Sequence, residues 1–194
     1  MPSRTRDALL DAAEELVDAG GADAATLREV GHRAGVSHNA PYKHFAGKEA
    51  LLAAVAAREL RRRHAVLAAA LERDEPPEEA LRGALHRYAE WAVEFPERFR
   101  LIYGRWTLGS EESAELAELA DAAHAASEQL VEVVRAAQER GTLPPDDPER
   151  LTALLRALAH GAADLTIAGH LSPEGKGHAD SAGLIDDLVG YLRP

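Results

Sequence analysis

Residues 26–45, TLREVGHRAGVSHNAPYKHF, are the most informative part of the sequence. It predicts two short helices, beginning at Thr26 and Ser37, that meet at a tight turn where Gly35 adopts the left-handed conformation. Thr26 and Glu29 have the spacing of a capping box, and Ser37 is expected to cap the second helix. Because so short a helix is not stable alone, it must be held by packing against the first. The pattern is typical of a helix-turn-helix, although two capped surface helices around an ordinary glycine turn would also produce it.

In a helix-turn-helix, the second helix presents its first residues to the major groove of DNA. Here His38 and Asn39 carry short hydrogen-bonding side chains that suit base edges, and Pro41 would offer an apolar face to a thymine methyl group. We expect these residues and Arg28 to select the base sequence, while donors at three helix starts bind phosphates. The predicted DNA-binding residues are Thr26, Arg28, Ser37, His38, Asn39, Pro41, Tyr42, Lys43, His44 and Lys48.

The remainder of the chain is also typical of helix, because β-branched residues never cluster and no segment alternates with period two. Gly20-Gly21 and a series of prolines mark the expected helix ends. We therefore expect an all-α protein with a three-helix helix-turn-helix domain at residues 1–50 and a helical regulatory and dimerisation domain at residues 51–194. About nine helices are predicted, at residues 4–19, 26–35, 37–45, 48–73, 78–95, 97–108, 112–140, 147–169 and 180–192.

Charge is distributed unevenly along the 194 residues, whose net charge is -11. Residues 1–64 hold ten Lys and Arg against nine Asp and Glu, whereas residues 65–194 hold 12 against 24. The N-terminal third is therefore the part suited to a polyanion. The chain has no cysteine, which excludes disulfides and thiolate metal sites, and its histidines lack metal-binding spacing, so we expect no metal or cofactor. No apolar run approaches the roughly 18 residues of a membrane span, which favours a cytoplasmic protein with no membrane partner that joins the nucleoid when bound to DNA.

Residues 4–55 resemble the N-terminal domain of the tetracycline-repressor-like (TetR) family of bacterial transcriptional regulators. The resemblance lies in TLREV (26–30), AGVS (34–37), APYKHF (40–45) and KEALL (48–52). Residues 88–103 are similar to the aromatic segment of the family's WHG subgroup, and His160-Gly161 match two of its three namesake residues, with Ala159 in place of the tryptophan. The resemblance implies an all-α homodimer that represses transcription and releases a palindromic operator when a small molecule fills the C-terminal domain.

Two helical segments of the C-terminal part carry apolar stripes, at 147–169 and 180–192. Pairing both with their symmetry mates would form a four-helix dimer interface, although either stripe could instead face the core of its own chain. The predicted dimer contacts are Leu151, Leu154, Leu155, Leu158, Leu165, Leu184, Leu188 and Leu192.

The aromatic residues gather around Pro96, where two predicted helices meet. They are expected either to form the core of the larger domain or to line a mostly apolar pocket for a small-molecule effector, and both can hold. The predicted ligand-binding residues are Trp91, Phe95, Phe99, Ile102, Tyr103, Trp106 and His160. Nearby, Arg61, Arg62 and Arg63 are expected to form a solvated face with salt bridges rather than a phosphate-binding stripe, because consecutive helical residues point in different directions.

Three functions compete at this point. A ligand-responsive DNA-binding repressor is favoured over a DNA-binding dimer that lacks an effector. An all-α enzyme belongs to a different class, and it would need a catalytic grouping of Ser, His and Asp, a carboxylate pair or a phosphate-binding loop, none of which stands out in the sequence.

Overall fold

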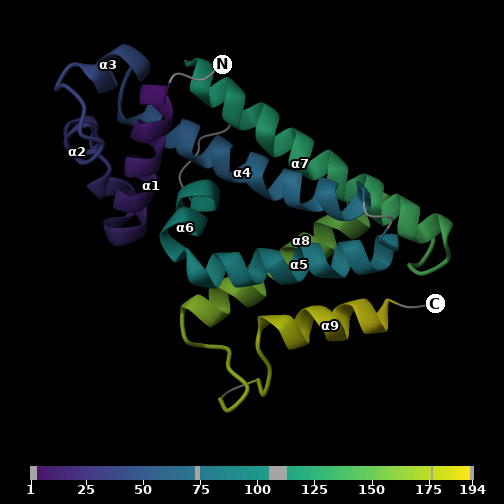
Figure 1. The fold of residues 1–194 in the computed structure, drawn as a ribbon. Coiled ribbons are helices and arrows are strands. Elements are labelled where there is room, and N and C mark those ends of the chain that lie inside the picture. The colour runs from purple at the N-terminus through teal and green to yellow at the C-terminus, as the bar shows by residue number, and fades with distance from the viewer. Residues whose placement is uncertain (1–3, 73–74, 105–112, 176, 193–194) are drawn as a thin grey trace. The chain divides into compact units, whose positions relative to one another are not determined.

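The structure, a computed structural model, describes residues 4–72, 75–104, 113–175 and 177–192. Within these residues the chain forms nine α-helices, which confirms the all-α prediction (Figure 1). The helices are α1 (Arg4–Ala24), α2 (Leu27–Arg33), α3 (Ala40–His44), α4 (Lys48–Glu72), α5 (Pro77–Glu94), α6 (Pro96–Gly104), α7 (Ala114–Glu139), α8 (Pro148–Ile167) and α9 (Ser181–Tyr191). None of the helices in the described ranges is both long and apolar enough to cross a membrane.

The helices form two compact units. Unit 1 takes its described residues from 1–62 and 95–124, and unit 2 takes them from 63–94 and 125–194. Helices α4 and α7 contribute residues to both units. The expected domain boundary at residue 50 stays a prediction.

Unit 1 is organised around α1, which packs against α2, α3 and α6 (Figure 1). The predicted end of the first helix is visible as a kink, because Gly20 and Gly21 leave the helical conformation, with Gly21 at a φ of 71°, before one more turn completes α1. The core of the unit consists of side chains from α1, α2, α4 and α6, together with Phe45, which follows α3. Its large members are Leu9, Leu10, Leu16, Val17, Leu27, Val30, Phe45, Leu51, Leu52, Val55 and Leu101.

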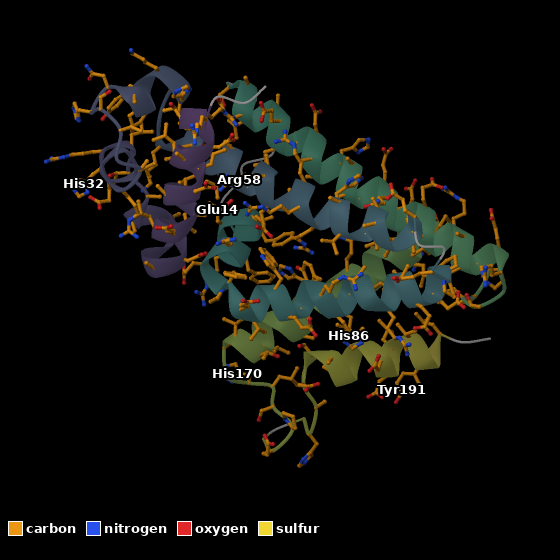
Figure 2. All side chains as sticks on the ribbon, in the orientation of Figure 1. Glu14, His32, Arg58, His86, His170 and Tyr191 are labelled. Carbon is orange, nitrogen blue, oxygen red and sulfur yellow. The ribbon has the colours of Figure 1, made fainter. Side chains whose placement is uncertain are left out.

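A cluster of ion pairs joins α1 to α4 inside unit 1. The carboxylate of Glu14, a residue only 7% exposed, accepts hydrogen bonds from Arg58 Nε at 2.7 Å and from Arg62 Nη1 at 2.9 Å. Figure 2 shows the Glu14 and Arg58 side chains pointing toward each other. On α6, Arg98 donates to Asp18 at 2.7 Å and lies 3.4 Å from Glu59. These contacts fix the helices that carry the helix-turn-helix.

Unit 2 is built on α5, which packs against α8 and α9 (Figure 1). Helices α8 and α9 begin at aspartate caps, since Asp147 and Asp180 each accept hydrogen bonds from backbone N–H groups of the first turn. The buried side chains of the unit include Leu81, Leu85, Val133, Val134, Leu143, Leu151, Leu155, Ile185 and Val189.

Candidate DNA-binding site

Helix α2 begins and ends where the sequence predicts. The hydroxyl oxygen of Thr26 accepts a hydrogen bond from the Glu29 N–H at 3.2 Å, which confirms the N-terminal cap. At the other end, Gly35 has a φ of 65° and donates its N–H to the His32 carbonyl, while the Val36 N–H donates to the Gly31 carbonyl, both at 3.1 Å. This pair of bonds is a Schellman motif, and it turns the chain sharply into the segment that precedes α3.

The start of α3 differs from the prediction. The helix begins at Ala40, and Asn39 occupies the cap position without a side-chain hydrogen bond. Ser37 is not the side-chain cap, because the Ala40 N–H already donates to the Ser37 carbonyl at 2.9 Å and Pro41 has no N–H to offer. His38 and Asn39 therefore lie in the turn before α3 rather than in its first turn.

Pro41 does not face outward as predicted. Its side chain is buried against α2, and a Cβ atom added to Gly31 would lie only 2.8 Å from Pro41 Cγ. The ring therefore fills the space that glycine leaves on α2, and it does not offer an apolar face to DNA. Phe45, at the end of α3, is 2% exposed, and the Arg6 guanidinium lies 5.4 Å from the centre of its ring. Pro41 and Phe45 hold α3 in place.

The other predicted DNA-binding residues lie at the start of α2, in the turn before α3, on α3 and at the start of α4. Tyr42 is 54% exposed, and its ring meets the ring of His38 edge-on at 5.9 Å. His44 and Lys48 are half-buried. The exposed members are Thr26, Arg28, Ser37, His38, Asn39, Tyr42 and Lys43. Seven of the ten predicted residues are thus exposed, all within residues 26–43.

Lys48 has a partner that the sequence does not reveal. Its Nζ atom lies 3.0 Å from the carboxylate of Asp23 and 3.4 Å from the Asp23 carbonyl oxygen. The ammonium group at the start of α4 is therefore partly neutralised in the free protein. Residues 26–48 still hold four Lys and Arg against one acidic residue, Glu29, so this segment is positively charged in a chain of net charge -11.

The predicted ligand-binding residues are divided between the two units. In unit 1, Phe99 and Ile102 are buried, and the half-exposed Tyr103 ring lies 5.5 Å from that of Phe99. Phe95, also in unit 1, is half-buried beneath the Arg98 guanidinium. Trp106 lies outside the described residues.

In unit 2, Trp91 and His160 are half-buried, and a residue absent from the prediction joins them. The Tyr88 hydroxyl is 2.7 Å from His160 Nδ1, and the Tyr88 ring lies 6.4 Å from that of Trp91. Burial lowers the pKa of His160, and Arg156 lowers it further, while Asp164 acts in the opposite direction. Among the described residues no group of three His, Cys, Asp or Glu side chains is placed to hold a metal ion.

The three consecutive arginines of α4 behave differently from one another. Arg61 pairs with Glu118 at 3.2 Å and Arg62 with Glu14, as the salt-bridge interpretation predicts. Arg63 instead stacks on aromatic rings of unit 2, 4.4 Å from the centre of Tyr88 and 4.6 Å from that of Trp91. The spacing of the arginines does not reveal this, because it depends on where α5 packs.

The leucines predicted to form a dimer interface are of two kinds. Leu151 and Leu155 are at most 2% exposed and belong to the core of their own unit, so the prediction that they contact a second copy is wrong. Leu154 and Leu165 are 56% and 45% exposed, on a side of α8 that adjoins the buried one. Leu158 on α8 and Leu184, Leu188 and Leu192 at α9 are half-buried.

Two short helices joined by a glycine turn, with a polar and basic outer surface, define a DNA-binding helix-turn-helix protein. Comparisons with known proteins agree. Residues 9–55 match the sequence profile described as "Bacterial regulatory proteins, tetR family", and residues 81–189, more than half of the chain, match "Tetracyclin repressor-like, C-terminal domain". The chain therefore belongs to the TetR family of transcriptional regulators, while its place in the WHG subgroup stays a prediction.

Solved structures share the fold over nearly the whole chain. A protein of unknown function from Rhodococcus sp. RHA1 is 29% identical, with 98% of this chain and 94% of that chain covered and a TM-score of 0.80. A regulatory protein of the tetR family from Rhodococcus RHA1 is 21% identical (98% and 95% covered, TM-score 0.68). A TetR/AcrR-family transcriptional regulator from Thermobifida fusca YX-ER1 is 22% identical (98% and 97% covered, TM-score 0.66). No curated protein sequence matches significantly.

Proposed function

We propose that this protein is a homodimeric repressor that binds a palindromic operator and releases it when a small molecule binds the C-terminal region. The observation that carries the DNA-binding part is the separation of side chains around α3. Pro41 and Phe45 point inward and hold the helix, while His38, Asn39 and Tyr42 are exposed beside it. A helix held from behind with polar groups in front is the arrangement that reads a major groove.

Within this proposal the exposed residues have two tasks. Arg28, His38 and Asn39 contact base edges and set the preferred sequence. The remaining donors bind phosphates and position the protein without selecting a sequence. This second group comprises Thr26, Ser37, Tyr42, Lys43, His44 and Lys48. Doubled in a dimer, they would neutralise on the order of 6–10 phosphates and make binding steeply dependent on salt.

Selection of bound sites from genomic fragments tests base reading directly. Asn39→Ala should relax the base preference at one symmetric pair of positions and cost about 1–3 kcal/mol per half-site, because a direct contact to a base edge is lost. His170→Ala, which removes an exposed histidine of unit 2, is the control for His38→Ala (Figure 2). Unchanged base preference in both His38→Ala and Asn39→Ala would remove direct readout from this segment.

Dimerisation is supported by the outer face of α8. Leu154, Leu158, Gly161 and Leu165 are spaced by four, three and four residues, so they form one stripe along the helix, and none of them is buried in its own unit. A stripe of this kind meets its symmetry mate in a two-fold interface. Leu184, Leu188 and Leu192 of the second segment would extend that interface.

Effector release is supported by the aromatic and half-buried residues of the C-terminal region. A ligand that changes the packing of α4, a helix with Lys48 at its start, would change how the recognition segments are presented. Such coupling is typically about 1–3 kcal/mol and is reciprocal, so operator DNA must weaken ligand binding by the same factor. A screen of apolar compounds by tryptophan fluorescence, followed by titration against the operator complex, tests it. A compound that binds tightly and leaves operator affinity unchanged would contradict the regulatory part alone.

A further inference from the structure

Arg63 lies in unusual surroundings in unit 2. Its guanidinium lies over the rings of both Tyr88 and Trp91, with centroid distances of 4.4 and 4.6 Å. The Nη1 atom is buried and has no hydrogen-bond partner. Within the described part of the chain, no carboxylate forms an ion pair with it. A positive charge therefore lies against two aromatic faces, with its Nη1 donor group unused.

The neighbouring arginines of α4 differ from Arg63 in their partners. Arg61 and Arg62 both have carboxylate partners, Glu118 and Glu14. Contact with the rings compensates part of the charge of Arg63, but it leaves the buried Nη1 group without a hydrogen-bond acceptor. Buried donors without acceptors are destabilising, and a bound ligand that carries an acceptor would remove this cost.

His160 does not supply the missing acceptor or a second positive charge. Its Nδ1 atom is already 2.7 Å from the Tyr88 hydroxyl, and burial lowers the pKa of its imidazole, so the ring is neutral at pH 7. Arg156, which acts on the same imidazole, donates to the Ser127 hydroxyl at 3.1 Å, and Asp164 is exposed. Tyr88 therefore links a neutral histidine to the cation, and Arg63 carries the positive charge against the rings.

We propose that Arg63 binds the carboxylate of a small organic acid, whose apolar part packs among the aromatic side chains of unit 2. The inference rests on the effector response proposed above and specifies its chemistry. A carboxylate accepts charge-assisted hydrogen bonds from the Nη1 group and neutralises the guanidinium without displacing it from the rings. The effector is thus an anion with an apolar body, rather than a purely apolar molecule.

Matched pairs of acids and amides test this proposal in the full-length protein. Butanoate, octanoate and dodecanoate are titrated by calorimetry beside their primary amides, which keep the shape and lose the charge. At least one acid should bind about tenfold or more tightly than its amide, because hydrogen bonds between charged partners are about twice as strong as neutral ones. Arg63→Gln should abolish that preference, and Arg63→Lys should keep part of it. Arg61→Gln removes a charge two residues away on the same helix and should leave the preference intact.

Thermal unfolding shows whether each variant is folded, and Arg63→Met, which keeps the volume of the stem, provides a second neutral variant. Equal binding of acid and amide would overturn the role of the carboxylate. So would a preference that persists in both Arg63→Gln and Arg63→Met, or the failure of every acid to bind. If an amide binds and releases operator DNA, the proposed effector response survives while the inference about Arg63 does not. If an acid binds through Arg63 and operator affinity does not change, the inference about Arg63 survives while the proposed effector response does not.

Discussion

Replacing Gly31 with alanine should loosen the helix-turn-helix. The new Cβ atom would lie 2.8 Å from Pro41 Cγ, about 0.7–1.2 Å closer than two carbon atoms prefer. The proline ring is tied to the backbone of α3, so relief requires α2 and α3 to separate rather than one side chain to rotate. Overpacking of this kind costs about 1–3 kcal/mol, and the better helix propensity of alanine returns about 1 kcal/mol. We expect a net loss of up to about 2 kcal/mol.

Urea unfolding at a fixed protein concentration measures this loss, and operator affinity should fall with it because α3 is displaced. The matched control is Gly190→Ala in α9, where a Cβ atom meets no other atom within 4 Å. That substitution should stabilise the protein by about 0.4–1 kcal/mol, through the entropy of the unfolded chain.

A double mutant isolates the contact. Combined with Pro41→Ala, Gly31→Ala should cost less than it does alone, because the smaller side chain leaves room for the new methyl group. The reasoning is refuted if Gly31→Ala stabilises the protein as Gly190→Ala does, or if the two substitutions in the helix-turn-helix have additive effects.

Three other outcomes are expected. Lys48→Ala should weaken binding to all DNA sequences about equally and flatten the salt dependence of binding. Asp23→Ala, which releases the Lys48 ammonium, should strengthen DNA binding. Gel shifts over a salt series measure both effects. Leu154→Glu should shift the protein toward monomer in sedimentation experiments, and a dimer of unchanged stability would remove α8 from the interface. The pKa of His160 is lower in the folded protein than the usual 6.5. As the pH falls, the unfolded chain therefore takes up a proton at this residue before the folded protein does. The contribution of His160 to stability is full above about pH 6.5 and is lost as the pH falls below that value. Stability curves of wild type and His160→Gln should therefore diverge on the acid side alone, and parallel curves would show that burial does not disfavour the charged imidazole.

The parts of the fold that depend on neighbouring residues can be predicted from the sequence. Thr26 as a cap and Gly35 as a left-handed residue follow from local geometry, and both predictions are confirmed. The position of Pro41 cannot be predicted in this way, because its burial depends on a missing Cβ atom on a different helix. The cap at Ser37 fails for a related reason, since its carbonyl rather than its hydroxyl meets the backbone of α3.

In the candidate sites too, features that depend on distant parts of the chain could not be predicted from the sequence. The apolar stripe of α8 is wide enough to cover two faces, and only the packing of α5 shows that Leu151 faces the core while Leu154 faces outward. Arg63 looks like the two arginines before it in the sequence, and only the position of α5 distinguishes it. Tyr88 is absent from the predicted ligand set because its contact with His160 joins residues 72 positions apart.

The division of labour around α3 has a consequence for how such a protein acquires new target genes. The residues that hold the recognition segment, Pro41 and Phe45, are different residues from the exposed His38, Asn39 and Tyr42. Substitutions at the exposed positions remove no buried contact, so they change the outer surface at little expense in folding free energy. If these exposed residues contact the operator as proposed, single substitutions at them would redirect the protein to another operator while the chain still folds.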